Sequence, residues 1–162
     1  MGAARLSFMR MPDVRFWKLC GSGVGEGFTP RPNTKVWAIL AVWDDQETAR
    51  AQTETAPVYR RWRERADECW TVYLTPESSR GMWSGSEPFS PGNRDTPPGA
   101  LAGLTPATIK PSALPHFWGK EPAISHAIGA DPNAHSKIGV GEVPVLHQVT
   151  FSVWPDTKSM TE

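Results

Sequence analysis

Short apolar runs alternate with Pro- and Gly-rich stretches along the whole chain, and the spacing of these runs predicts a mixture of strands and helices. Runs rich in aliphatic and aromatic residues predict strands at residues 16–21, 35–43, 70–75, 101–109, 136–141 and 146–154. The run at 35–43 is apolar almost throughout, which is typical of a strand buried on both faces. Good helix formers and apolar spacing predict helices at 1–12, 44–68 and 112–130, and another beginning after Asp156.

Residues at the ends of these segments refine the prediction. Asp44 and Asp45 follow a strand directly and predict a helix N-cap, where negative charge meets the positive end of the helix. Pro57 interrupts the helix at 44–68 or restarts it. Pro106 indicates that the strand at 101–109 is an edge strand or carries a bulge. Ser112 is the predicted N-cap of the helix at 112–130, with Gly129 as its C-terminal glycine.

Two stretches share one plan and suggest a duplicated unit. Gly21-x-Gly23 matches Gly139-x-Gly141, and Val42-Trp43-x-Asp45 matches Val153-Trp154-x-Asp156. Within a unit the order is strand, helix, strand, strand, helix, strand, which is the ferredoxin-like split plan. The sequence therefore predicts an α+β fold of tandem ferredoxin-like βαββαβ units that form a pseudo-dimeric α/β barrel.

The same alignment of elements predicts the domain organisation. Residues 1–84 form the first unit, residues 85–100 a Pro- and Gly-rich linker, and residues 101–162 the second unit. The first unit lacks its first strand and the second lacks its last helix and strand, so we expect a fold that is incomplete at both termini.

Composition narrows the class of protein. The chain has 162 residues, 39% of them hydrophobic, and a formal net charge of zero. Zero net charge argues against general nucleic-acid binding, which needs an excess of positive charge. No apolar run approaches the roughly 20 residues of a membrane span, and no signal-peptide core follows the N-terminus. Cys20 and Cys69 lack metal-site spacing, and the alternative is a disulfide between them. Nothing in the sequence indicates an oxidising compartment, so we expect reduced thiols in a cytoplasmic protein.

An ordered set of motifs resembles the spheroidene monooxygenase family of carotenoid biosynthesis. The motifs are Phe16-Trp-Lys-Leu-Cys-Gly-Ser-Gly23, Glu26-Gly-Phe-Thr-Pro30, Asn33-Thr-x-Val36, Gly81-x-Trp-Ser-Gly85 with Pro88-Phe89, Leu104-Thr-x-Ala-Thr-Ile109, Phe117-Trp118, Gly129-Ala-Asp-Pro-Asn133, and the stretch from Lys137 through Met160. The resemblance covers essentially the whole chain. Family members are longer at both ends, which agrees with the elements that the repeat predicts to be missing, and Met1 resembles a methionine inside a family helix.

The resemblance implies a haem-containing, dioxygen-dependent oxygenase. It would oxidise an acyclic carotenoid such as spheroidene to a terminal ketone by successive hydroxylations, with electrons from reduced ferredoxin. Reaching such a substrate implies a cytoplasmic protein with peripheral membrane association. The alternative is a non-catalytic α/β-barrel domain that binds an apolar ligand or serves as a dimerisation module.

A haem oxygenase needs an axial ligand, and His147 and then His116 are the candidates. His147 lies in the family-like segment at the start of a strand, where a hydrogen-bonded structural histidine is the competing interpretation. Cys20 is a further candidate ligand, although a cysteine at the end of a buried strand is more often core. His126 and His135 are predicted to be surface residues.

Aromatic and basic side chains supply the rest of the candidate site. Five tryptophans either line a tunnel for the polyene or form ordinary core, namely Trp37, Trp43, Trp83, Trp118 and Trp154. Four arginines either meet haem propionates or a ferredoxin surface or form a solvated helix face, namely Arg60, Arg61, Arg63 and Arg65.

Overall fold

The computed structural model describes residues 2–25, 29, 31–92, 99–120, 135–142 and 146–161. The chain divides into two compact units, one of Met1–Lys18 and Leu40–Asp95, the other of Leu19–Ile39 and Thr96–Glu162. The elements in chain order are α1 (Gly2–Met9), β1 (Val14–Gly23), β2 (Pro32–Trp43), α2 (Gln46–Thr55), α3 (Pro57–Arg63), β3 (Leu101–Thr108), the 3₁₀ turn η1 (Pro111–Ala113), β4 (Ser136–Gly141), β5 (His147–Trp154) and α5 (Thr157–Thr161). Residues 114–120 continue η1 as α-helix.

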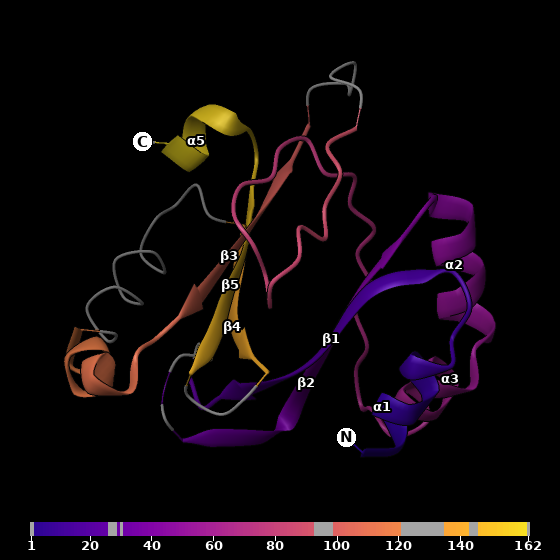
Figure 1. The fold of residues 1–162 in the computed structure, drawn as a ribbon, viewed down its shortest axis with the longest axis horizontal. Coiled ribbons are helices and arrows are strands. Elements are labelled where there is room, and N and C mark those ends of the chain that lie inside the picture. Colours follow the sequence, from indigo (N-terminus) through magenta and orange to yellow (C-terminus); the bar gives the residue numbers. More distant parts are fainter. Residues whose placement is uncertain are drawn as a thin grey trace. The chain divides into compact units, whose positions relative to one another are not determined.

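The strands form a five-stranded sheet in the order β2-β1-β4-β5-β3, of which β3, β4 and β5 lie wholly in the second unit (Figure 1). β5 pairs antiparallel with β3 on one side and with β4 on the other. A βαββ segment of the split plan places its third strand between its first and second, and β5 has that position. The predicted mixed fold of helices and strands is therefore confirmed, whereas the tandem ferredoxin-like units and their closure into a pseudo-dimeric barrel stay predictions.

The register gives this part of the sheet two chemically different faces. Side chains of directly paired residues lie on the same face, so the odd-numbered residues of β5 share a face with their partners on β3 and β4. That face, named the apolar face here, carries Ala102, Leu104, Pro106, Thr108, Ser136, Ile138, Val140, His147, Val149, Phe151 and Val153. The opposite face is more mixed: it carries Gly, Thr, Ser and Gln residues together with Leu101, Ala107, Lys137 and Trp154. Met160 of α5 lies over Gly103 on this face.

The glycines of the internal repeat meet in this unit. Gly21 of β1 pairs with Gly141 of β4, and the Ser22 hydroxyl donates a hydrogen bond of 2.8 Å to the carbonyl oxygen of Gly139. A Cβ placed on Gly21 would lie 3.4 Å from the ring of Trp37. That contact would be ordinary, whereas a Cβ placed on Gly141 would lie 2.7 Å from the carbonyl oxygen of His147, so Gly141 is the glycine that allows a close approach.

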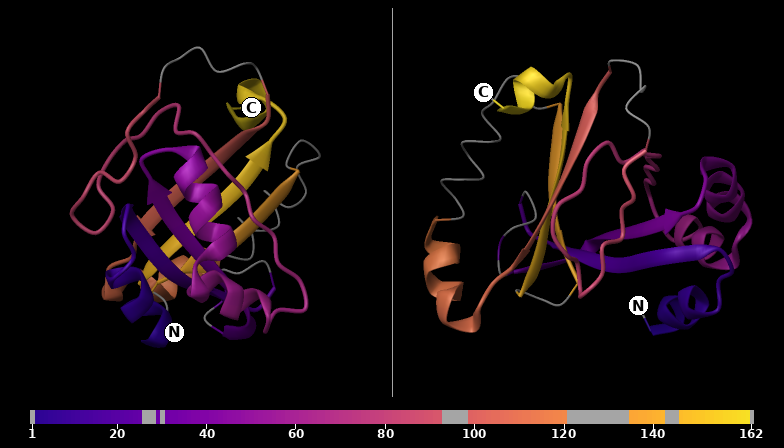
Figure 2. Two further views of the ribbon diagram at one scale, coloured as in Figure 1. Left: turned by 90° about the vertical axis from the view of Figure 1, so that its right-hand side faces the viewer. Right: turned by 45° about the horizontal axis from the view of Figure 1, so that its top comes forward.

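The first unit is built around the helices α1, α2 and α3, which Figure 2 shows from two further sides. Phe8 of α1 is 1% exposed and stacks on Trp17 with ring centroids 5.4 Å apart. Tyr59 of α3 meets the same ring edge-on at 5.7 Å, and Val58 is 2% exposed. A second aromatic contact joins Phe16 to Trp83, which is 7% exposed, so the tryptophan at 83 is core.

The predicted aspartate cap is confirmed at Asp45, and Asp156 caps the helix that was predicted to follow it. The Thr48 amide donates to Asp45 Oδ1 at 2.7 Å, and the Ser159 amide donates to Asp156 Oδ1 at 2.8 Å. These hydrogen bonds lower the pKa of both carboxyl groups below their ordinary value because they stabilise the charged form. Pro57 restarts a helix as predicted: Ala56 ends α2 and Pro57 begins α3.

Two strand predictions are wrong in part. Residues 70–75 belong to no strand, and Trp70, Val72 and Leu74 are 65%, 39% and 48% exposed. In the split plan the last strand of a unit pairs with the first, and the described residues contain no such first strand. The predicted strand at 35–43 exists as part of β2, but none of its residues is fully buried, because β2 ends the strand order and keeps one open edge.

A helix start also differs from the prediction. Ser112 lies inside η1 and Lys110 is the N-cap residue, because Pro111 fits the first helical position and starts the turn earlier. The predicted C-terminal Gly129 lies outside the described residues. Pro106 lies in β3, the last strand of the sheet order, so the predicted edge position is confirmed. The predicted organisation into residues 1–84, 85–100 and 101–162 stays a prediction.

Candidate functional site

The candidate site is the apolar face of the second unit, with His147 at one end. Val149 is 1% exposed and Val140 is 8% exposed, whereas Phe151 and Ile138 are half-buried. β5 has eight residues and therefore presents this face over roughly 25 Å. The face thus forms an extended aliphatic and aromatic strip on a rigid sheet.

His147 is held by a neighbouring strand. It pairs with Thr108 across β3 and β5, and its Nδ1 lies 3.2 Å from Thr108 Oγ1. In the tautomer with the proton on Nδ1, the ring donates to the Thr108 hydroxyl and Nε2 keeps its lone pair. The residue is half-buried, so the imidazole has an oriented but accessible nitrogen.

The other histidines are placed differently. His116 lies on the exposed side of the helix at residues 114–120, and His135, just before β4, is exposed as predicted. His126 lies outside the described residues. Beside His116, the half-buried Trp118 has a buried indole Nε1 that lacks a hydrogen-bond partner among the described residues.

The predicted tryptophans have different environments. Trp154 lies on the opposite face of β5 and donates from its Nε1 to Ser152 Oγ at 3.0 Å. Trp37 is 47% exposed on β2 and donates to the carbonyl of Thr34. Trp43 belongs to the first unit, where it is half-buried at the end of β2. Sequence reasoning could not separate the faces because it lacked the strand register.

The remaining candidates have structural environments. Cys20 is 2% exposed, as expected for core, and Cys69 is an exposed free thiol. The guanidinium of Arg63 donates to the carbonyl oxygens of Thr53 and Glu54 at 2.7 and 2.8 Å, which satisfies the C-terminal end of α2. Arg63 therefore has a capping role that the charge pattern did not predict.

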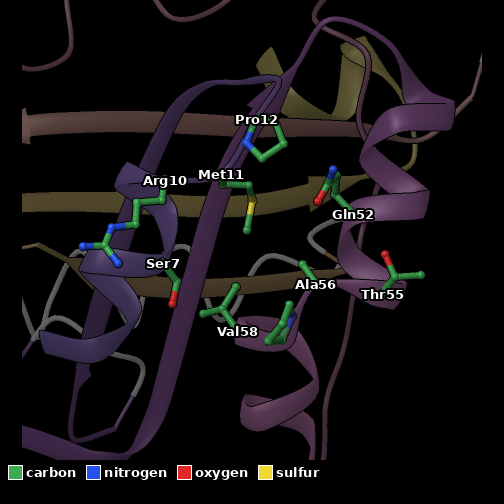
Figure 3. Close-up of a pocket in the computed structure, with 9 residues that line it drawn as sticks. Ser7, Arg10, Met11, Pro12, Gln52, Thr55, Ala56 and Val58 are labelled. Carbon is green, nitrogen blue, oxygen red and sulfur yellow. The ribbon is translucent and has the colours of Figure 1, made fainter.

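A hollow in the first unit was not predicted from the sequence. It has a volume of about 450 Å³ and lies between the end of α1 and the junction of α2 with α3 (Figure 3). Its lining includes Arg10, Met11 and Gln52. The sequence signal for this hollow was the break between two helices at Pro57. Such a break does not specify which other element of the chain lies beside it.

Within the ranges that the structure describes, there is no group of three or more His, Cys, Asp or Glu side chains arranged to hold a metal ion. None of the described helices is long and apolar enough to cross a membrane. Burial raises the pKa of the Tyr59 hydroxyl, and the nearby Tyr73 hydroxyl adds to this effect, so Tyr59 is a neutral core residue.

Comparison with known proteins shows which family of proteins the chain resembles. The chain is 51% identical over all of its 162 residues to a spheroidene monooxygenase of Cereibacter sphaeroides, of which it covers 50%. It is 49% identical over 92% of its length to the spheroidene monooxygenase of Rhodobacter capsulatus and 31% identical over 92% to that of Rubrivivax gelatinosus, covering 63% and 58% of those proteins. No family model and no solved structure matches the chain. The chain spans about half to two-thirds of the length of these relatives, and the predicted resemblance to the spheroidene monooxygenase family is confirmed along essentially all of its residues.

Proposed function

We propose that this chain is part of a monooxygenase that oxidises an acyclic, spheroidene-like carotenoid to a terminal keto carotenoid. The observation that carries the proposal is the 51% identity over every residue of the chain to a protein named spheroidene monooxygenase. The apolar face supports it because a polyene is bound through non-directional apolar contact, and this strip offers that contact over several residues of β5.

Haem is the proposed cofactor, and the surroundings of His147 fit it. A haem iron takes one or two axial ligands, so one oriented imidazole suffices. A ligating histidine typically donates its other ring N–H to a neighbouring group that fixes its orientation, and Thr108 Oγ1 at 3.2 Å offers that acceptor. When bound, haem would supply the activation of dioxygen.

The residues of the chain then have distinct roles in this proposal. The Thr108 hydroxyl orients the His147 ring, while Val140 and Val149 exclude water beside it. Phe151 and Ile138 continue the strip on which the polyene lies. His116 is the weaker ligand candidate, because its exposed helical position offers no apolar surroundings.

Dioxygen, reduced ferredoxin and a membrane surface complete the proposal. Ferredoxin is the proposed source of electrons, and peripheral contact with a membrane would give a cytoplasmic enzyme access to a lipid-soluble substrate. Leu6 and Met9 on α1 are 56% and 72% exposed and are suited to shallow contact with lipid.

A non-catalytic role remains the second candidate, as an apolar-ligand or dimerisation domain. Residues 70–75 favour it, because exposed Val72 and Leu74 provide an apolar surface without any reaction chemistry. This candidate requires neither haem nor electron transfer.

Expression of the chain in a bacterium that accumulates spheroidene distinguishes the two candidates. Monooxygenase activity predicts a new pigment whose mass reflects the gain of one oxygen and the loss of two hydrogens. The full-length Cereibacter sphaeroides relative is the positive control. Unchanged pigment, with active control protein and folded chain in the same host, would contradict catalysis by this chain.

Haem binding to the purified chain tests the ligand. We expect a Soret band that is lost in His147→Ala and retained in His116→Ala. Thr108→Val should weaken haem binding about 10-fold, because the ring loses its orienting partner. A His147→Ala protein that keeps its spectrum would contradict the ligand assignment and leave the proposed reaction to the pigment test.

A further inference from the structure

The hollow of the first unit has an apolar interior and a polar rim. Its most buried lining residues are Ala56 and Val58, at 8% and 2% exposed, and the side chain of Met11 points toward Val58 (Figure 3). Ser7 and Thr55 lie at the rim, where they are half-buried and exposed. The volume of about 450 Å³ falls within the roughly 300–1,000 Å³ of small-molecule pockets. The hollow therefore has the size and the division of surface that suit an amphipathic small molecule.

The apolar part of the lining is aliphatic. Met11, Val58 and the rings of Pro12 and Pro57 supply it, and none of the nine lining residues is aromatic. Without an aromatic ring the hollow has no surface on which a flat ring would stack. A methionine side chain instead adapts its shape to a flexible neighbour. This lining therefore favours an alkyl chain over an aromatic ring system.

The backbone holds both walls of the hollow in place. At the end of α1, the ring of Pro12 fixes its own φ, and Asp13 follows with a φ of 64°, in the left-handed region that a non-glycine residue adopts only when its surroundings determine it. On the opposite wall, the Ala56 amide donates to the carbonyl oxygen of Gln52 at 3.0 Å and closes the end of α2. A ligand would thus enter a hollow whose walls are already formed.

The two hydroxyl groups at the rim have their protons engaged within their own helices. The Ser7 hydroxyl donates to the carbonyl oxygen of Ala3 at 3.1 Å, and the Thr55 hydroxyl donates to that of Ala51 at 2.7 Å. Neither hydroxyl group is therefore the natural donor to an anionic ligand.

The donors that remain are Arg10 and Gln52. Among the residues that the structure describes, neither the Arg10 guanidinium nor the Gln52 side-chain amide has a hydrogen-bond or ion-pair partner. Arg10 is the only charged residue of the lining, and its guanidinium points away from Met11, at the mouth of the hollow (Figure 3). The charge of the mouth is therefore positive, and it complements an anionic head group that stays close to water.

We infer that this hollow is a binding site for a small aliphatic carboxylate. The alkyl chain would lie against Met11 and Val58, and the carboxylate would accept hydrogen bonds from Arg10 and from the Gln52 amide at the mouth. The site belongs to the first unit alone, and the inference depends on neither haem nor carotenoid chemistry.

Titration with decanoate, kept below its critical micelle concentration, tests the site. The full 162-residue chain is labelled with ¹³C at its methionine methyl groups and observed by NMR. We expect a saturable shift of the Met11 methyl resonance, whereas that of Met82, 71% exposed and outside the lining, stays unchanged. Decan-1-ol should bind about 5-fold more weakly, because its uncharged head group loses the attraction to Arg10.

Two arginine variants separate the site from general attraction of anions. Arg10→Gln should weaken decanoate binding about 5-fold and leave binding of decan-1-ol unchanged, because it removes the charge and keeps most of the side-chain stem. Arg5→Gln, at an exposed position of the same helix outside the lining, should change neither.

Three results would overturn the inference. One is an equal loss of decanoate binding in Arg10→Gln and Arg5→Gln. Another is a saturable shift of Met160 in place of Met11, which would put the alkyl chain in the second unit. The third is an unchanged Met11 resonance in a chain whose circular dichroism shows it to be folded.

Discussion

At the scale of single residues, burial separates neighbours that look alike in the sequence. Phe8 and Met9 are adjacent on α1, yet Phe8 is 1% exposed and Met9 is 72% exposed. Phe8 also stacks on Trp17 and meets Tyr59, so it links α1 to β1 and α3. The first unit therefore depends on one phenylalanine far more than on the methionine beside it.

Phe8→Ala should lower the free energy of unfolding by about 3–5 kcal/mol, because it leaves a cavity among aromatic rings. Met9→Ala is the matched control and should change it by no more than about 0.5 kcal/mol. Urea titration followed by tryptophan fluorescence measures both. Equal losses in the two variants would contradict the proposed core.

Asp45 gives the stability a dependence on acid pH. Hydrogen bonds from Thr48 lower the pKa of the Asp45 carboxyl group in the folded state. The cap therefore stabilises the fold fully at pH values above the ordinary pKa that this carboxyl group has in the unfolded chain. That contribution disappears as the pH falls through the lowered folded pKa. Asp45→Asn keeps an acceptor for the Thr48 amide but cannot titrate.

We therefore expect Asp45→Asn to flatten the acid side of the stability curve, measured as urea midpoints between about pH 2 and 6. Asp67→Asn, at an exposed position, removes the same charge as a control. Acid curves for Asp45→Asn and Asp67→Asn that run parallel to each other would contradict a special role for the cap.

At the scale of elements, the structure was predictable where the signal is local. The caps at Asp45 and Asp156 follow from a short polar acceptor placed before a helix, and the restart at Pro57 follows from a fixed φ. The pairing of β4 with β5 follows from two apolar runs that are close together in the sequence. These signals need no knowledge of the distant chain.

Predictions failed where an element depends on its partner. Residues 70–75 have a strand-like sequence, but a strand forms only when another strand supplies its hydrogen bonds. The burial of β2 was overestimated for the same reason, since an apolar run does not show whether its strand lies at an open edge of the sheet. The side of the sheet on which Trp154 and His147 lie depends on register, which the sequence does not specify across β3, β4 and β5.

Gly141 tests the close packing of β4 on β5. A Cβ at this position would lie 2.7 Å from the carbonyl oxygen of His147, a backbone atom that cannot move aside cheaply. Gly141→Ala should therefore destabilise the chain by about 1–3 kcal/mol. Gly119→Ala is the control: its added methyl meets no atom within 4 Å in a helical segment, so stability should rise by up to about 1 kcal/mol.

Thermal unfolding monitored by circular dichroism compares the two glycine variants. A lower midpoint for Gly141→Ala with an unchanged or higher midpoint for Gly119→Ala is expected. The opposite order would show that the β4–β5 contact is looser than described.

At the scale of the whole molecule, the second unit supplies the apolar face with His147 at its end, and the first unit has a separate aromatic core around Phe8. The 51% identity along the full length of the chain makes a shared reaction with the relatives the strongest functional proposal. The His147 imidazole, oriented by Thr108, makes haem a cofactor that can be tested. Two successive hydroxylations at one carbon give a geminal diol, and loss of water leaves the ketone. A monooxygenase takes the oxygen atom of each new hydroxyl group from dioxygen, so both oxygens of this diol come from dioxygen.

Oxygen-isotope incorporation is therefore the most direct test of the central claim. The purified chain is supplied with spheroidene, haem, reduced ferredoxin and ¹⁸O₂ in unlabelled water, and the product is analysed by mass spectrometry. The account predicts a keto carotenoid whose carbonyl carries ¹⁸O. A keto product with unlabelled oxygen, or no product while the full-length relative yields labelled ketone under the same conditions, would contradict it.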